Sequence, residues 1–382
     1  MNKNLDVLVV AAENSAENYA AQVVNFFAEK NPDFRFFGLG GEKLRSAGMD
    51  VVVENSELAV VGIFEVLAHL LRMRRLMKKL EHEAIERKAV AALLVDFPDF
   101  NLRLAAKLRA AGIRVYFYIS PTVWAWRYSR VKRIREVVDH LFIIFPFEKP
   151  IYTREAIPHT YIGHPLLAAL SQANSRSAAR KKFGLRQEET ALALLPGSRP
   201  SEISDLVPVM LNALAGLRAQ KPLKVFLLKA RGVPPRFFSR LDLAAENIEA
   251  VEQENGHELM LASDLVLTTC GTSTLEAALL GSPLIALYKV NPLSYFFGRR
   301  LVRIDLYSIV NILANRWLVP ELIQADCNPE SLFREAARIL ADPLLRDELK
   351  LSFREIRDSL VVDKDPAEFI YSRMIGEIGP NH

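Results

Sequence analysis

The 382-residue sequence has little cysteine and no long apolar segment. Its two cysteines, Cys270 and Cys327, form neither a disulfide framework nor the spaced pairs of a metal site. No apolar run reaches the roughly 18 to 20 residues that a membrane-spanning helix needs. The opening residues MNKNLDVLVV lead directly into a strand-like run and lack the pattern of a secretory signal. We therefore expect a cytoplasmic protein without a membrane span.

Glycine is absent from Leu5 to Phe27, although this segment otherwise has the form of a nucleotide-binding turn. An apolar run ends at Val10, and a helical period of apolar residues begins at Tyr19. A dinucleotide-binding turn is glycine-rich, because its backbone N–H groups must approach a pyrophosphate. Two interpretations follow: a phosphate loop that has lost its role, or a loop that serves another ligand.

The net charge is also small: 49 basic and 45 acidic residues give +4. This excess is too small to indicate a nucleic-acid partner. Basic residues do gather among apolar ones at residues 66–83 and again at 290–307. A basic amphipathic segment can lie on an anionic membrane surface, or it can be a surface helix whose apolar side faces the core. These residues alone leave both interpretations open.

Short apolar runs alternate with helical patterns along the chain, with a polar break near residues 170–188. Apolar strands separated by helices predict parallel sheets that are covered on both faces. We expect an α/β protein with two doubly wound domains, 1–170 and 171–350, that face each other across a cleft. The last helices, 351–382, are expected to cross back to the first domain. Ligands of such sheets bind beyond the C-terminal ends of the strands.

The strongest local motif is LTTCGTSTLEAALLGSPLIALY, residues 267–288. A strand precedes Gly271, which permits a tight turn, and a helix begins at Thr272 or Ser273. The N–H groups at the positive end of this helix suit a diphosphate. Glu276 has two interpretations: it completes a capping box with Ser273, or it accepts hydrogen bonds from the ribose hydroxyls of a nucleotide.

A second motif, LALLPGSRPSEI, places Ser198 and Arg199 just after a strand that ends at Leu195. Arginine offers a planar fork that binds phosphate through two hydrogen bonds. A solvated arginine in an ordinary turn is the alternative. Together with the preceding motif, this turn predicts a nucleoside-diphosphate site in the second domain.

In the first domain, Asp96 directly follows a buried strand, and Asp99 lies three residues further on. A carboxylate that is partly removed from water at a strand end suits a general base. Asp99 fits better as the cap of the following helix. Trp124 and Trp126 lie close to the basic residues of 127–133. This mixture can hold a sugar phosphate or a lipid headgroup, or it can simply pack and be solvated.

Taken together, the motifs resemble one family, the lipid-A-disaccharide synthases, which are inverting glycosyltransferases with two Rossmann-like domains in the GT-B arrangement. The similarity runs in order through VGIFEVL, DFPDFN, SPTVWAWR, PFEKPIY, IGHP, LLPGSRPSEI, CGTSTLEAAL and NILANRWLVPELIQ. The resemblance implies that 2,3-diacylglucosamine passes from UDP-2,3-diacylglucosamine to the 6-hydroxyl of 2,3-diacylglucosamine 1-phosphate. The products would be UDP and a β-1,6-linked disaccharide 1-phosphate.

The resemblance also implies roles for residues of this sequence. Asp96 would take the proton of the acceptor hydroxyl, and Glu13 and Ser15 would face the acceptor. Donor binding would fall to Ser198, Arg199, Gly271, Thr272, Ser273, Glu276, Asn311, Glu321 and Gln324. Because an arginine and a helix N-terminus would stabilise the departing UDP, the resemblance implies no metal and no cofactor. The first domain would face the acceptor and the membrane, and the second would bind the UDP-sugar.

Both substrates carry acyl chains, so the resemblance implies peripheral association with the cytoplasmic face of the inner membrane. It leaves a homodimer open. Two other functions also stay open: a related UDP-sugar enzyme, either another lipid-linked glycosyltransferase or a 2-epimerase, and a catalytically silent lipid-binding descendant.

The first turn departs from the family pattern Gly-Glu-x-Ser-Gly-Asp. Glu13 and Ser15 are kept, but Ala12 and Ala16 replace the glycines and Glu17 replaces the aspartate. Added Cβ atoms hinder a close backbone approach and disfavour positive φ. We therefore expect this loop to decide whether the acceptor is altered.

Overall fold

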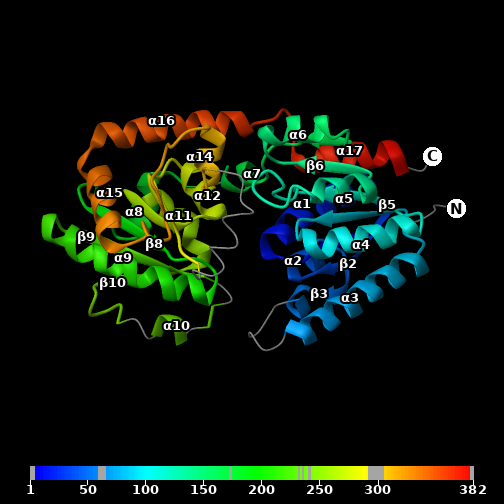
Figure 1. Cartoon of the computed structure of the whole chain (residues 1–382), viewed down its shortest axis with the longest axis horizontal. Helices are drawn as coiled ribbons and strands as arrows, with labels where there is room; N and C mark the ends of the chain where they lie inside the picture. The colour runs from blue at the N-terminus through cyan, green and yellow to red at the C-terminus, as the bar shows by residue number, and fades with distance from the viewer. Residues whose placement is uncertain are drawn as a thin grey trace. The chain divides into compact units, whose positions relative to one another are not determined.

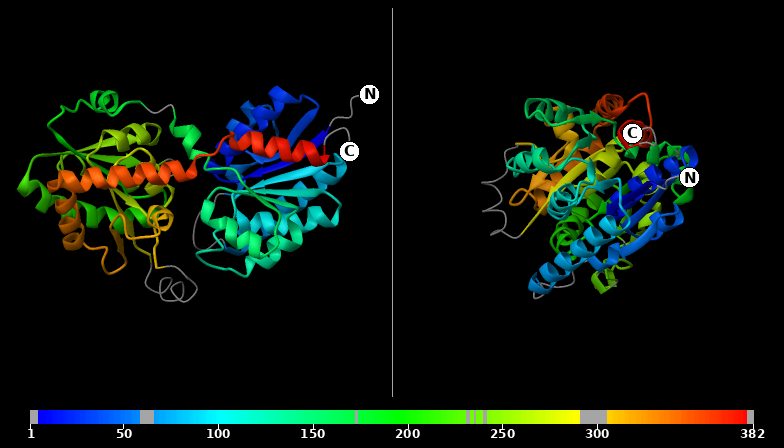
Figure 2. Two further views of the ribbon diagram at one scale, coloured as in Figure 1. Left: turned by 90° about the horizontal axis from the view of Figure 1, so that it is seen from above. Right: turned by 90° about the vertical axis from the view of Figure 1, so that its right-hand side faces the viewer.

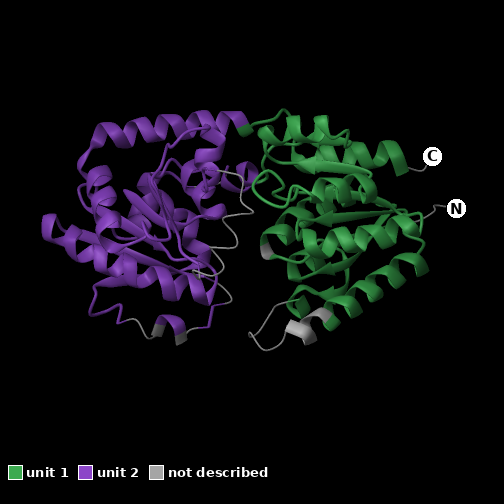
Figure 3. Ribbon diagram, in the orientation of Figure 1, with its two compact units in different colours: residues 1–165, 360–382 green, residues 166–359 purple. Residues whose placement is uncertain are grey.

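The computed structural model describes residues 5–58, 66–171, 174–230, 233–234, 236–239, 242–290 and 305–378. The chain divides into two compact units (Figure 3). Unit 1 comprises Met1–Pro165 and Leu360–His382, and unit 2 comprises Leu166–Ser359. The chain therefore leaves unit 1 and returns to it near its end.

The sheet of unit 1 is parallel, with the strand order β3-β2-β1-β4-β5-β6-β7 (Figure 1). Its strands are β1 (Leu5–Ala11), β2 (Phe34–Gly40), β3 (Asp50–Glu54), β4 (Ala91–Val95), β5 (Arg114–Tyr118), β6 (His140–Ile143) and β7 (His159–Tyr161). Every residue of β4 is buried. Such continuous burial is expected of a parallel strand with helices on both faces.

Helices cover both faces of this sheet (Figures 1 and 2). One face carries α1 (Asn14–Lys30), α2 (Glu42–Ser46) and α17 (Pro366–Ile378), and the other carries α3 (Val66–Glu86), α4 (Pro98–Ala110) and α5 (Arg130–Val137). The shorter helices are η1 (Asn55–Leu58), η3 (Pro146–Glu148) and α6 (Lys149–Arg154). The ring of Tyr371 on α17 lies 4.8 Å from that of Phe27 on α1. The last helix is therefore part of the core of unit 1.

The basic segment at 66–83 lies within α3. Its buried side chains include Leu76, Met77 and Leu80. The described part of the helix therefore packs its apolar side on the sheet, as the surface-helix interpretation expects. Leu71 is nevertheless 47% exposed among the basic residues. Most of the second basic segment, residues 291–304, lies outside the described residues.

The sheet of unit 2 is also parallel, with the order β10-β9-β8-β11-β12-β13. Its strands are β8 (Thr190–Leu195), β9 (Leu223–Lys229), β10 (Ile248–Glu252), β11 (Leu265–Thr269), β12 (Leu284–Tyr288) and β13 (Glu321–Ile323). The helices are α7 (Leu166–Leu170), α8 (Arg176–Lys182), α9 (Pro200–Gln220), α10 (Arg236–Ser239), η4 (Gln253–Asn255), α11 (Gly256–Ala262), α12 (Thr272–Leu279), α14 (Ile309–Ala314), α15 (Pro329–Ala341) and α16 (Pro343–Leu360). α9 and α15 share one hydrophobic core with the sheet.

Each sheet has a point at which the strand order reverses, between β1 and β4 in unit 1 and between β8 and β11 in unit 2. In a doubly wound sheet, ligands bind beyond the C-terminal strand ends at this switch point. The prediction of two parallel-sheet α/β domains is confirmed. The two switch points are accordingly the first places to look for a functional site.

Candidate functional site

Glu13 and Asp96 stand at the switch point of unit 1. β1 and β4 are paired in parallel up to Ala11 and Val95, so the chain segments that follow them emerge next to each other. Asp96 comes directly after β4, and Glu13 is the N-cap residue of α1. The sheet therefore brings together two carboxylates that lie far apart in the sequence.

Asp96 is half-buried, and burial raises the pKa of its carboxyl to about 6. The negative charge of Glu13 adds to this rise, and a hydrogen bond from the backbone of Phe97 opposes it. A carboxylate with this pKa is ionised at neutral pH, yet it is a stronger base than an exposed aspartate. Its environment therefore suits proton abstraction.

The turn after β4 is held in an unusual conformation. Asp96 and Phe97 both have left-handed backbone, with φ of 51° and 46°. The fully buried Asn101 donates from Nδ2 to the backbone oxygen of Asp96 at 2.7 Å. The backbone N–H of Asp96 donates to the oxygen of Tyr118 on β5 at 2.9 Å. These bonds compensate for the strain and fix where the carboxylate of Asp96 emerges.

The alanines of the first turn occupy ordinary backbone. Ala12 and Ala16 are not among the residues with positive φ, so neither position requires glycine for its conformation. Glu13 and Ser15 are exposed and remain accessible to a ligand. The helix begins normally despite the missing glycines.

Glu17 has an inward-facing role that the sequence did not indicate. Its Oε1 accepts a hydrogen bond from the backbone N–H of Lys43 at 2.8 Å, and its Oε2 accepts from Nδ2 of Asn55 at 3.0 Å. Lys43 lies in the first turn of α2, so Glu17 satisfies a free N–H at that helix end. Glu17 is buried, and its hydrogen bonds connect α1 to the start of α2 and to Asn55.

The expectation that Asp99 caps α4 was wrong. The helix begins at Pro98 after the N-cap residue Phe97, and no side chain caps it. Asp99 is therefore inside the first turn, where its side chain points outward. Its Oδ1 instead accepts hydrogen bonds from Arg127 at 3.2 Å and from Arg130 at 2.6 Å.

At the switch point of unit 2, the turn after β8 presents Ser198 and Arg199. Both residues are exposed, and the Arg199 side chain is 76% exposed. The carboxylate of Glu202 accepts hydrogen bonds from the backbone N–H groups of Ser198 at 2.9 Å and Arg199 at 3.2 Å. Gly197 has a φ of 113°, and a Cβ there would lie 2.2 Å from Glu202 Oε2. The turn therefore requires glycine. The Arg199 guanidinium is largely exposed and donates one hydrogen bond to Glu202 Oε1 at 3.2 Å.

The neighbouring strand β11 leads into α12, whose N-cap residue is Gly271. Gly271 and Thr272 are exposed, and the hydroxyl of Ser273 lies 2.7 Å from that of Thr268. Because Gly271 rather than Ser273 is the N-cap, the capping box between Ser273 and Glu276 does not form. The helix N-terminus is therefore open at the C-terminal edge of the sheet, beside the turn of Arg199.

Glu276 has a partner that sequence reasoning missed. Its Oε2 lies 3.8 Å from Nε2 of His257, which belongs to α11. The neighbouring carboxylate of Glu276 raises the pKa of His257, although burial of the imidazole opposes the rise. Nothing in the spacing of these residues connects them, because α11 and α12 meet only in the folded unit.

Asn311 and Glu321 form a buried network. Asn311 donates from Nδ2 to Glu321 Oε1 at 2.8 Å and to the oxygen of Val319 at 2.9 Å. Its Oδ1 accepts from the backbone N–H groups of Leu318 and Val319. Glu321 also accepts from the backbone N–H of Ser308 at 2.7 Å. Since every hydrogen-bonding group of the Asn311 amide is used, these two side chains hold the loop after α14 in place.

Gln324 follows β13 at the same edge of the sheet, with left-handed backbone (φ 53°). Its Oε1 accepts a hydrogen bond from the N–H of Val290 at 3.4 Å. Among the described side chains its Nε2 is one of the few buried atoms without a hydrogen-bond partner. A buried amide donor without a partner is uncommon in folded proteins, which makes Gln324 a candidate for contact with a ligand.

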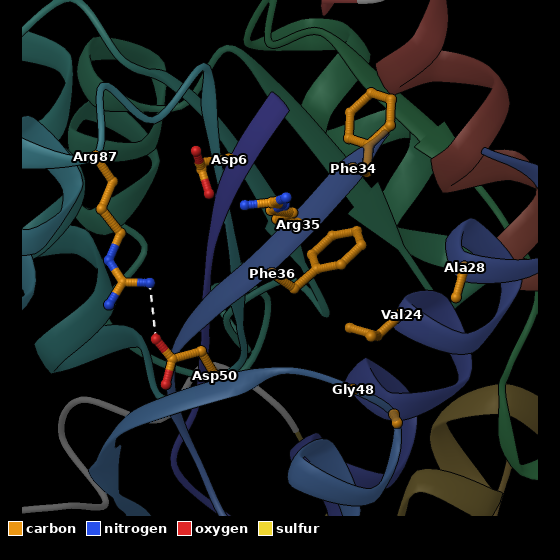
Figure 4. Close-up of a pocket in the computed structure, with 10 residues that line it drawn as sticks. Asp6, Val24, Ala28, Phe34, Arg35, Phe36, Gly48, Asp50 and Arg87 are labelled. Atoms are coloured by element: carbon orange, nitrogen blue, oxygen red, sulfur yellow. Dashed lines mark ion pairs between the residues drawn. The ribbon is translucent and has the colours of Figure 1, made fainter. Parts of the chain in front are cut away.

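A cavity of about 470 Å³ lies elsewhere in unit 1 (Figure 4). It borders residues at the start of β1, β2 and β3, including Asp6, Phe34 and Asp50. Asp50 forms an ion pair with Arg87 at 2.8 Å across it. These residues belong to the N-terminal end of the sheet, opposite to Asp96, so this cavity is separate from the candidate site.

No described helix has the length and apolar character to cross a membrane. The described part of the chain also holds no cluster of three or more histidine, cysteine, aspartate or glutamate side chains suited to a metal ion.

Known proteins resemble this chain in both sequence and fold. Residues 7–364 match the lipid-A-disaccharide synthetase family. The lipid-A-disaccharide synthase of Anaeromyxobacter dehalogenans is 41% identical over 356 residues, which cover 93% of each chain. Neither a 2-epimerase nor a catalytically silent descendant is favoured by these matches.

Solved structures with low identity show the same fold. The UDP-GlcNAc 2-epimerase of Neisseria meningitidis superposes with a TM-score of 0.68 at 12% identity, covering 98% of this chain and 100% of that one. The calicheamicin glycosyltransferase CalG4 superposes with a TM-score of 0.62 at 14% identity, covering 99% and 100%. The fold is thus that of the GT-B glycosyltransferases. The family match over nearly the whole chain shows that this protein belongs to the lipid-A-disaccharide synthetase family and is a glycosyltransferase of lipid A biosynthesis.

Proposed function

We propose that this enzyme transfers 2,3-diacylglucosamine from its UDP conjugate to the 6-hydroxyl of 2,3-diacylglucosamine 1-phosphate. The observation that carries the proposal is the chemistry at the two switch points. Unit 1 presents a half-buried carboxylate, Asp96, with a raised pKa. Unit 2 presents an exposed arginine, Arg199, and the open N-terminus of α12. One site supplies a base and the other a place for a diphosphate.

The base is Asp96. It removes the proton from the 6-hydroxyl of the acceptor as the oxygen attacks the anomeric carbon of the donor sugar. The bond from that carbon to the diphosphate breaks on the opposite side, so the configuration at this carbon inverts. Glu13 and Ser15, both exposed beside Asp96 in the chain that follows β1, contact the acceptor sugar.

The departing UDP acquires negative charge in the transition state. Arg199 and the N–H groups at Gly271, Thr272 and Ser273 are positioned to stabilise it, and Ser198 adds a hydroxyl donor. In this arrangement the protein supplies the positive potential that a metal ion supplies in other enzymes. The reaction accordingly proceeds without a metal or a cofactor.

The nucleoside is held by the remaining residues of unit 2. Glu276 accepts hydrogen bonds from the ribose hydroxyls, and Gln324 donates its unpaired Nε2 to an acceptor of the donor substrate. Asn311 and Glu321 act indirectly, because their hydrogen bonds are directed to the loop that they support.

The acyl chains of both substrates require contact with a membrane. The basic face of α3 and the exposed Leu71 support peripheral docking of unit 1 on the cytoplasmic face of the inner membrane. Unit 1 is thus the acceptor and membrane-facing domain, and unit 2 is the UDP-sugar domain. A homodimer is compatible with these assignments, which do not require one.

The test is release of UDP by the purified protein in detergent, given UDP-2,3-diacylglucosamine with and without 2,3-diacylglucosamine 1-phosphate. We expect release that requires the acceptor and disappears in Asp96→Asn, while Asp96→Asn still binds UDP. Turnover without acceptor, or an undiminished rate in Asp96→Asn, would overturn the proposal.

A further inference from the structure

Four side chains form a compact basic cluster close to Asp96: Asp99, Trp126, Arg127 and Arg130. The guanidinium of Arg127 lies over the ring of Trp126 at 4.3 Å from its centroid, and that of Arg130 at 5.0 Å. Both arginines also reach Oδ1 of Asp99, at 3.2 Å and 2.6 Å. One aromatic ring and one carboxylate therefore hold two guanidinium groups together.

The cluster carries more positive than negative charge. Two arginines share the single carboxylate of Asp99, which is 61% exposed and therefore a weak partner. Arg130 is also the first residue of α5, where the helix dipole is positive and disfavours a cation. Two like charges held next to each other at such a position are stabilised further when an anion arrives.

The arginines are held in place before any ligand binds. Nε1 of Trp126 donates to Oγ1 of Thr122 at 3.1 Å, which fixes the ring. The side chain of Arg130 is only 11% exposed, and Arg127 has left-handed backbone with a φ of 52°. Arginines ordered in advance lose less entropy when they form paired hydrogen bonds with a phosphate.

The cluster lies within the reach of one sugar from Asp96. Asp99 follows Asp96 by three residues and lies in the first turn of α4, which begins at Pro98, so the Cα atoms of the two residues are no more than about 11 Å apart. β5 pairs with β4 so that Tyr118 lies beside Val95, and the loop that begins directly after Tyr118 contains Arg127 and leads to Arg130 at the start of α5. In a glucosamine 1-phosphate, C1, which carries the phosphate, and C5, which carries the hydroxymethyl group with the 6-hydroxyl, are both bonded to the ring oxygen, so the two groups lie on the same side of one sugar. An acceptor whose hydroxyl meets Asp96 can thus direct its phosphate to the arginines.

We propose that Arg127 and Arg130 form a phosphate-binding site that recognises the 1-phosphate of the acceptor. This inference rests on the proposed function and names the group that unit 1 recognises. The phosphate competes with Asp99 for the two guanidinium groups, and Trp126 keeps their planes oriented. The same chemistry would bind the phosphate of an anionic lipid headgroup, which the experiment must separate from the acceptor.

The experiment compares two acceptors, 2,3-diacylglucosamine 1-phosphate and 2,3-diacylglucosamine without the phosphate, in the detergent assay for UDP release. The wild-type enzyme should have a lower KM for the phosphorylated acceptor. Arg127→Gln and Arg130→Gln should each raise that KM about tenfold with little change in kcat, so that the preference between the acceptors shrinks. Arg133→Gln, on the exposed side of α5, is the matched control and should keep the preference.

Asp99→Asn separates a binding site from a structural ion pair. If the arginines bind phosphate, removal of the competing carboxylate lowers the KM for the phosphorylated acceptor, opposite to the effect of the arginine variants. If the cluster only stabilises the loop, Asp99→Asn and the arginine variants shift both acceptors in the same direction. That second result would overturn the inference.

Binding of the proteins to vesicles of phosphatidylglycerol and phosphatidylcholine separates the acceptor from the headgroup. We expect Arg127→Gln and Arg130→Gln to bind these vesicles like the wild type. Weakened vesicle binding together with an unchanged acceptor preference would assign the cluster to the headgroup and overturn the inference. If the proposed function is wrong, the wild type releases no UDP with either acceptor, which distinguishes this result from the outcomes above. That result would also overturn the inference.

Discussion

Glu13 and Asp96 follow β1 and β4, the two strands between which the first sheet reverses its order, and the charge of Glu13 helps to raise the pKa of Asp96. Their proximity follows from strand pairing, because Ala11 and Val95 are opposite each other in the sheet. The pair connects the first turn to the proposed base, so removal of the charge of Glu13 also changes the pKa of Asp96.

The pH dependence of the reaction should reflect this pair. Asp96 must be ionised to act as a base, so kcat/KM should rise as the pH increases through about 6. Glu13→Gln removes a like charge, which lowers the pKa of Asp96 and moves the rise to lower pH. The pH profile of UDP release measures both. Ser15→Ala, which changes no charge, serves as the control, and a Glu13→Gln profile shifted upward would contradict the assignment.

The same carboxylate should make folding stability depend on pH. The pKa of Asp96 is about 6 in the folded protein against 3.8 in the unfolded chain, so its contribution favours folding below pH 3.8 and is lost as the pH rises through 6. Asp96→Asn should therefore stabilise the protein by about 3 kcal/mol at pH 8 and by much less at pH 3.5. Denaturant unfolding at the two pH values measures the difference, and equal gains at both would refute it.

Arg199 should contribute to the transition state more than to ground-state binding. Arg199→Gln is expected to lower kcat by about 100-fold, because a preorganised donor to the developing charge is lost. Arg199→Lys should recover part of the loss, since it keeps the charge without the fork. Steady-state kinetics with saturating acceptor measure both variants. Arg186→Gln, an exposed arginine of the same unit, should behave like the wild type.

His257 should act through Glu276. The pKa of His257 is raised, so in the wild type the KM for the UDP-sugar should change as the imidazole loses its proton above pH 6.5. His257→Asn should remove this dependence and leave kcat nearly unchanged. His82→Asn, at an exposed position of α3, is the control. A pH-dependent KM that persists in His257→Asn would show that the two residues are not coupled.

Asn311 should matter for stability. Asn311→Ala leaves several buried backbone groups of the loop at Leu318 and Val319 without partners, and we expect a loss of about 3 kcal/mol in the free energy of unfolding. The exposed Glu348→Ala should have little effect. Denaturant unfolding of both variants provides the measurement, and an unchanged midpoint for Asn311→Ala would contradict the supporting role.

The sequence by itself determined the fold class and the places where chemistry occurs. Apolar strands alternating with helices specify parallel sheets, and the residue after such a strand lies at the C-terminal edge of the sheet. Asp96, Arg199 and Gly271 could therefore be selected from the sequence, because each directly follows or nearly follows an apolar run. Gly197 could be recognised in the same way as a turn residue, although the reason it must be glycine is its contact with Glu202.

Only the tertiary structure decided which side chains meet. Asp99 has the spacing of a cap, yet it binds Arg127 and Arg130 because α4 begins two residues earlier than a cap at that position would require. Glu276 has the spacing of a capping box, yet its partner is His257 on another helix. Local spacing describes contacts within one helix or turn. The order of strands and the packing of helices bring distant segments together, and the electrostatic environment of each carboxylate depends on those segments.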